Sequence, residues 1–374
     1  MAWRFRKSFR IVPGVRLNVS SRGVSATIGG GALSLNVGAN GAAVNANLPG
    51  TGLSFRHRLA AGGGANLALD GPPPSQPDRV EIQSASTYEL SSDALAELQK
   101  ILTDAAREQQ ELAAAMASAE PNAITKNERL DRWSNGLIFR HVFKKRFLAI
   151  TSEAEEASAL LAELREQSRL ALVATHIDVS DVLRRPFGRL CDAFSRLAEC
   201  SKIWDTLAIQ KTDRFRERTT AAHAIERKSV RFALGASDLL ICEWKVPKLA
   251  NANGGDLYLY PGFVLYRVSR QSFAVIDARE VSLRFSATRF IEEEGVPPDS
   301  ETVGQAWKKA NKDGTPDRRF AANYRIPIVK YGEIAFTTAS GLNEVYLISN
   351  YAAAEGFAGA WDSYQATFET QTQS

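Results

Sequence analysis

The sequence predicts a multidomain α+β protein with an N-terminal antiparallel β-meander, a central helical bundle or hairpin, and a C-terminal β-rich sandwich or barrel with a closing helix. Two changes in hydrophobic periodicity indicate this order. Apolar residues alternate with polar ones to about residue 58, repeat every three or four residues over 91–230, and alternate again beyond 231. We therefore expect a meander over 1–59, a linker over 60–78, a helical region over 79–230 and a β-rich domain over 231–374.

The first segment has the alternation that is typical of half-buried strands. Trp3, Phe5 and Phe9 are separated by polar residues, and similar short runs follow at 15–19, 24–28, 33–37, 44–48 and 53–55. Turn glycines recur between the runs: Gly14, Gly23, Gly31, Gly41 and Gly50. Most apolar residues here are small, so the sheet needs cover from another domain, another copy or a ligand.

The central segment begins after a flexible and then stiff stretch that contains Gly62–Gly64 and Pro72–Pro74. An apolar seam follows the cap candidates Ser91–Asp93: Leu95, Leu98, Leu102, Ala105, Gln109, Leu112 and Met116. Gln109 interrupts this seam and favours an ordinary bundle helix over a coiled coil. Further helices are expected over 126–174 and 180–228. The second of these would bury one apolar face: Phe194, Leu197, Ile203, Trp204 and Leu207.

The C-terminal segment again has the period of strands. Candidate strands lie at 257–259, 263–265, 274–276, 281–285, 325–328 and 344–348, and a short helix is expected over 351–361. The pair Pro261–Gly262 predicts a tight turn. A pleckstrin-homology-like fold has this outline by analogy alone.

Composition favours a cytoplasmic, folded protein. Hydrophobic residues make up 44% and charged residues 24% of the chain. Cys191, Cys200 and Cys242 lack the spacing of a zinc site or a disulfide framework. The sequence contains neither a signal peptide nor an apolar run long enough to span a membrane. We found no phosphate-binding loop, nucleophile elbow or zinc-binding helix motif, so no catalytic residue, metal or cofactor is predicted.

Positive charge is concentrated in the first 60 residues. This segment carries eight Lys or Arg residues and no acid, so its charge is +8 and that of the remainder is −4. The candidate basic surface consists of Arg4, Arg6, Arg10, Arg56 and Arg58. A second basic run, Arg140 and Lys144–Arg146, alternates with Phe139, Phe143 and Phe147. This pattern fits either nucleic-acid binding or, better, a helix with a buried aromatic stripe.

A polar loop is the other candidate site. Its charged residues are Lys312, Asp313, Asp317, Arg318 and Arg319. Such a cluster can bind a metal or an anion, or act on a phosphate. The favoured interpretation is a polar hairpin whose aspartates cap their own turns. The nearby run Glu292–Glu294 is interpreted as solvated.

Three motifs at the N-terminus resemble a known family: Trp3–Ser8, Pro13–Asn18 and Leu48–Ser54. Together they are similar to the bacterial domain of unknown function 4236 over about the first 58 residues. Gly29–Ala32 departs from that pattern, where a basic turn residue is expected. The resemblance implies a bacterial source and a domain that heads varied C-terminal regions, and it assigns no activity, cofactor or catalytic residue.

Three functions follow as hypotheses. The first is a non-enzymatic interaction or assembly protein whose meander docks a protein partner or self-associates. The second is binding of nucleic acid or another anionic surface through the basic N-terminal segment. The third is an enzyme that uses the Asp313 and Asp317 region.

Overall fold

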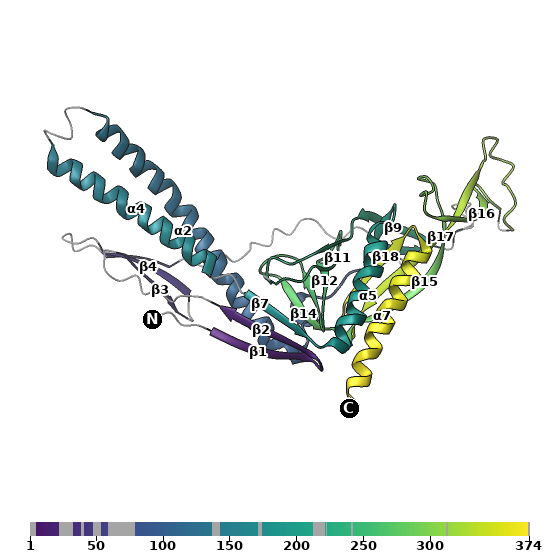
Figure 1. The fold of residues 1–374 in the computed structure, drawn as a ribbon. Helices are drawn as coiled ribbons and strands as arrows, with labels where there is room; N and C mark the ends of the chain where they lie inside the picture. The colour runs from purple at the N-terminus through teal and green to yellow at the C-terminus, as the bar shows by residue number, and fades with distance from the viewer. Residues whose placement is uncertain are drawn as a thin grey trace.

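The structure is a computed structural model, and it describes residues 5–21, 33–38, 41–47, 54–58, 79–136, 143–170, 174–211, 221, 223–240, 242–311 and 313–372. Figure 1 shows a body of sheets and helices from which two long helices extend together as an arm. The C-terminal helix runs along one side of this body.

The N-terminal strands divide between two sheets. The first is a three-stranded antiparallel sheet of order β1-β2-β7, made of β1 (Phe5–Val12), β2 (Val15–Ser21) and β7 (Ala174–Val179). The second consists of β3 (Leu33–Gly38), β4 (Gly41–Asn47) and β5 (Ser54–Arg58). The prediction of antiparallel N-terminal strands is confirmed, but that of one continuous meander is wrong, because β2 takes β7 as its second neighbour. The strand expected at 24–28 lies outside the described residues.

The central helices form a hairpin, which was one of the two predicted arrangements. After α1 (Thr87–Leu90) and η1 (Asp93–Leu95), α2 (Ala96–Ser134) and α4 (Lys144–Leu170) pack against each other. Leu112 contacts Leu164 in one small cluster between them, and a second cluster joins Ala123 to Ala157 and Leu161. The helix expected over 126–174 is wrong in its bounds, because α2 continues through Pro121 to Ser134. Among the described residues, no helix is both long and apolar enough to cross a bilayer.

The next predicted helix is shorter than expected. α5 (Asp181–Ala198) buries Phe194 and Leu197 as predicted and contains Pro186 within its length. The prediction of helix as far as 228 is wrong, since β8 (Ile203–Lys211) and β9 (His223–Val230) follow. Four consecutive buried residues, 203–206, begin β8. Such a short buried run fits a strand that is covered on both faces as well as it fits a helix.

Two antiparallel sheets form most of the body. One has the order β10-β11-β12-β13-β14. Its strands are β10 (Ala233–Gly235), β11 (Val246–Leu249), β12 (Asp256–Tyr260), β13 (Phe263–Arg267) and β14 (Phe273–Asp277). The other has the order β15-β17-β18-β8-β6, with β16 beside β17 and β9 beside β8. Its remaining strands are β6 (Arg79–Glu81), β15 (Ser282–Ile291), β16 (Glu301–Trp307), β17 (Arg325–Thr337) and β18 (Asn343–Ile348).

These sheets do not close into a barrel within the described part of the chain. The short η2 (Ala278–Glu280) connects β14 to β15. The closing helix α7 (Tyr351–Thr372) packs against α5, β15 and β17, which confirms the predicted helix and extends it. α5 and α7 lie side by side in Figure 1.

One hydrophobic core connects these elements. It includes Leu17 and Val19 of β2, Ile177 of β7, Phe187 of α5 and Tyr364 of α7, together with residues of both large sheets. The small apolar residues of the first hairpin are therefore covered by the rest of the same chain. Of the three kinds of cover that the sequence allowed, another part of this protein provides it for β1 and β2.

Candidate interaction surface

The β1-β2-β7 sheet has one buried face and one polar face. Leu17 and Ile177, paired on β2 and β7, are almost fully buried. Arg10 and Arg16 alternate with the buried positions and are exposed. This is the alternation expected of an antiparallel sheet that covers a core on one side only.

The register places two arginines directly opposite each other. Arg10 of β1 pairs with Arg16 of β2, and Asp178 of β7 lies on the other side of Arg16. Within the part of the chain that the structure describes, neither arginine forms an ion pair. Like charges directly opposite each other destabilise a sheet. Asp178, opposite Arg16 on β7, offsets one of these two charges, so the outer face keeps a net positive charge around Arg10 and Arg16.

The edge of this face at β7 carries both acidic and titratable basic side chains. His176 Nδ1 lies 3.5 Å from a carboxylate oxygen of Glu243, and both side chains are largely exposed. Asp178 is exposed on the same strand. The outer face is thus basic over β1 and β2 and mixed along β7.

The structure brings together few of the residues that the sequence proposed for the basic surface. Arg4 lies outside the described residues, and so do the side chains of Arg6, Arg56 and Arg58. Arg10 is exposed as expected. Its cross-strand partner Arg16 was not predicted as part of this surface, because a β-bulge between positions 10 and 12 shifts the register. In a regular two-residue hairpin, Arg10 would face position 17, and nothing in the sequence marks the bulge.

The polar loop forms closed turns. Asp313 accepts hydrogen bonds from the backbone N–H and the hydroxyl of Thr315, at 3.1 and 2.7 Å, and these bonds lower the pKa of its carboxyl. Buried Asp317 accepts from Arg319 Nε at 2.9 Å and from Nη2 at 2.6 Å. Arg318 is exposed, and Lys312 lies outside the described residues. These contacts agree with the favoured interpretation, in which each aspartate caps its own turn.

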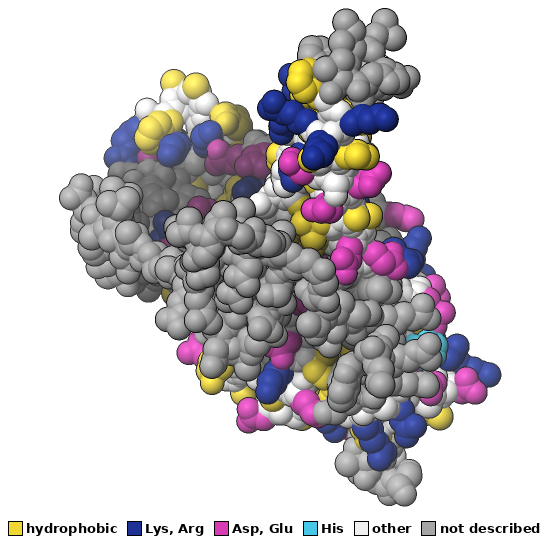
Figure 2. Space-filling view, turned by 90° about the vertical axis from the view of Figure 1, so that its left-hand side faces the viewer, with side chains coloured by type: hydrophobic (Ala, Val, Ile, Leu, Met, Phe, Trp, Pro, Cys, Tyr) yellow, Lys and Arg dark blue, Asp and Glu magenta, His cyan; other side chains and the backbone are white. Residues whose placement is uncertain are grey.

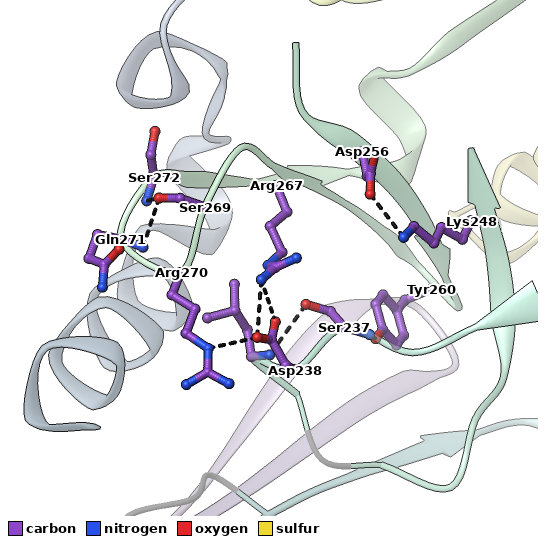
Figure 3. Close-up of polar contacts among 11 residues, drawn as sticks. Ser237, Asp238, Lys248, Asp256, Tyr260, Arg267, Ser269, Arg270, Gln271 and Ser272 are labelled. Carbon is purple, nitrogen blue, oxygen red and sulfur yellow. Dashed lines mark hydrogen bonds and ion pairs between the residues drawn. The ribbon is translucent and has the colours of Figure 1, made fainter. Parts of the chain in front are cut away.

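A second charged cluster, which no sequence motif marks, lies on the five-stranded sheet (Figure 3). Asp238 accepts from Arg267 at 2.9 Å and from Arg270 at 2.7 Å. Nearby, the Ser237 N–H donates to the Tyr260 hydroxyl at 3.0 Å, and burial raises the pKa of that hydroxyl. The cluster holds the segment before β11 against the turn between β13 and β14.

A buried ion pair borders a cavity of about 350 Å³. Arg227 lies between the rings of Trp204 and Phe290, 4.0 and 4.1 Å from their centroids. It donates to both oxygens of Glu292, at 2.8 and 3.0 Å, and Tyr331 donates to Glu292 at 2.7 Å. The interpretation of Glu292 as a solvated residue is therefore wrong, because its side chain is fully buried.

A second hollow of about 460 Å³ lies between α5 and α7, where Arg189 and Arg196 face Gly356 and Gly359. Within the described residues, no three His, Cys, Asp or Glu side chains are placed to hold a metal ion. Burial raises the pKa of the Cys191 thiol to about 12 and that of Cys200 to about 11, so neither is a thiolate at neutral pH.

Comparison with known proteins supports the N-terminal resemblance alone. Residues 3–56 match the family model described as "Protein of unknown function (DUF4236)". This match covers β1 to β4 and part of β5. No curated protein and no solved structure matches the chain.

Proposed function

We propose that this is a non-enzymatic interaction protein that docks an acidic partner protein on the outer face of its β1-β2-β7 sheet. The observation that carries the proposal is the pairing of Arg10 with Arg16, both exposed. Charge repulsion across a strand pair costs stability unless something else compensates it, and Asp178 opposite Arg16 offsets only one of the two positive charges. A carboxylate-bearing surface provides that compensation, since guanidinium groups bind carboxylates through paired hydrogen bonds.

The buried face of the sheet supports docking through the outer face. Because β1 and β2 are covered by the same chain, their apolar side is unavailable to a partner. A cytoplasmic partner fits the three unpaired cysteines, which imply a reducing compartment.

Nucleic acid is the second candidate partner. The net positive charge of the first 60 residues favours it. The outer face itself carries Ser8, Arg10, Arg16, Asn18, His176 and Asp178. None of these offers the flat Phe, Tyr or Trp ring on which single-stranded bases stack, so we favour an acidic protein.

The test compares the intact chain with the R10S/R16S double variant. The probes are fluorescent poly-glutamate and a short duplex DNA, each titrated at low and high salt. We expect poly-glutamate to bind more tightly than DNA, the double variant to lose about tenfold in affinity for it, and high salt to weaken the wild type. Equal affinity of the variant and the wild type for poly-glutamate overturns the proposal, and a loss confined to DNA supports the second candidate.

A matched control removes two other exposed strand arginines. R284S/R289S makes the same change in charge on β15, far from β1 in the sequence. It should bind poly-glutamate as the wild type does. Truncation of the N-terminus is a poorer test, because loss of β2 would expose Ile177 and Val179 of β7.

A further inference from the structure

The α2–α4 arm ends far from the core. Ala106 is the last residue of α2 in the main core, and from there α2 continues for about 40 Å at ~1.5 Å per residue. Contacts between the two helices hold this length together, such as Arg165 to Glu120 at 2.7 Å and Asn127 to Ser158 at 3.0 Å. Figure 1 shows the free end of the arm well away from the two large sheets of the body.

Large apolar side chains are exposed near this end. Phe143 is 51% exposed and Leu148, one turn into α4, is 65% exposed. Ile124 of α2, farther from the end and beside Ala123, is 53% exposed. The clusters that hold the two helices together lie closer to the body, around Leu112 and Ala123. Phe143 and Leu148 thus present apolar surface to the solvent beyond these clusters.

Positive charge accompanies these apolar residues. Lys144, Lys145 and Arg146 are exposed between Phe143 and Leu148. The sequence has no Asp or Glu between Asp131 and Glu153. Closer to the body, α4 becomes acidic, with Glu153, Glu155 and Glu156. Figure 2 shows Lys and Arg side chains gathered near the end of the taller projection at the upper right, with Asp and Glu side chains farther down.

We propose that the end of this arm binds an anionic lipid surface. Lys144, Lys145 and Arg146 contact headgroup phosphates, while Phe143 and Leu148 enter the boundary between headgroups and acyl chains. Basic residues together with exposed aromatic and aliphatic ones at one end are the chemistry of peripheral membrane attachment. An acidic polymer would satisfy the cations but leave Leu148 in water, so the combination favours lipid over nucleic acid or an acidic protein.

The experiment measures co-sedimentation of the full chain with vesicles. One set is phosphatidylcholine with phosphatidylserine, and the other is phosphatidylcholine alone. We expect binding to the anionic vesicles only, with about a tenfold loss in K144S/K145S/R146S and a similar loss in F143S/L148S. Because all five side chains are exposed, both variants should keep the helical circular dichroism and the melting temperature of the wild type.

Controls separate this surface from others on the molecule. R185S/R189S/R196S removes three exposed arginines of α5, and V182S removes an exposed apolar residue of the same helix. Both should bind vesicles as the wild type does, and so should R10S/R16S, which keeps the arm intact. The proposal is overturned if the wild type fails to sediment with anionic vesicles. It is equally overturned if F143S/L148S binds them undiminished, a result that points to a charge-only partner such as nucleic acid.

Discussion

The backbone N–H of Gly262 donates a 2.8 Å hydrogen bond to the hydroxyl of Tyr364. This bond joins the β12–β13 turn to the closing helix α7. On its other side the same turn contacts the first hairpin, because a Cβ at Gly262 would lie 2.9 Å from a methyl of Val12. Gly262 also has a φ of +84°, which favours glycine. The N-terminus, the five-stranded sheet and the C-terminus therefore meet at one residue.

We predict that Gly262→Ala lowers the free energy of unfolding by about 2 kcal/mol, through backbone strain and the contact with Val12. Tyr364→Phe should lower it by about 1 kcal/mol, because one buried N–H loses its acceptor. Urea titration followed by circular dichroism measures both. Gly356→Ala, on the exposed side of α7 with open space around its Cβ, is the control. It should leave stability unchanged or raise it, and an equally harmless Gly262→Ala would refute the packing described.

Glu344 on β18 makes stability depend on pH. Burial raises the pKa of its carboxyl to about 7, and the Asp205 carboxyl nearby contributes. The side chain accepts hydrogen bonds from Ser84 Oγ at 2.6 Å and from the Asn251 amide. Because the folded pKa lies above the ordinary value of 4.5, the stabilisation is complete below about pH 4.5 and is lost as the pH rises through about 7.

We expect Glu344 to make the protein up to about 3 kcal/mol less stable at pH 8 than at pH 5. Glu344→Gln should flatten this slope, since a neutral amide does not titrate. Unfolding free energies at several pH values between 5 and 8 measure the effect. Glu355→Gln on the exposed side of α7 is the control and should keep the slope of the wild type. A slope unchanged in Glu344→Gln would contradict the prediction.

Elements with local signals could be predicted from the sequence, and those set by distant partners could not. The turn at Pro261–Gly262 and the closing helix were predictable because the hydrophobic periodicity and the turn residues within each segment specify them. The pairing of β2 with β7 joins residues that are more than 150 positions apart, and no local pattern selects it. The same holds for β8, where buried Trp204 fits a helix face as well as a strand.

The candidate sites divide in the same way. The turn-capping role of Asp313 depends on neighbours within two residues and could be predicted. The opposition of Arg10 and Arg16 depends on a bulge that only the paired strands define. The burial of Glu292 depends on Arg227 and Tyr331, each at least 39 positions away in the sequence.

The pair of Arg227 and Glu292 should behave as one unit. The side chains are 6% and 0% exposed, so removal of one partner leaves the other charge in a site with little water. We expect Arg227→Met and Glu292→Gln each to lower the unfolding free energy by about 3–5 kcal/mol. The double substitution R227M/E292Q should cost clearly less than the sum of the two single ones, because it leaves no uncompensated charge.

Arg165→Met provides the contrast, since its pair with Glu120 is about half exposed and should contribute less than about 1 kcal/mol. Chemical denaturation of the four variants and the wild type completes the cycle, and additive costs for Arg227 and Glu292 would show that the two side chains stabilise the fold independently.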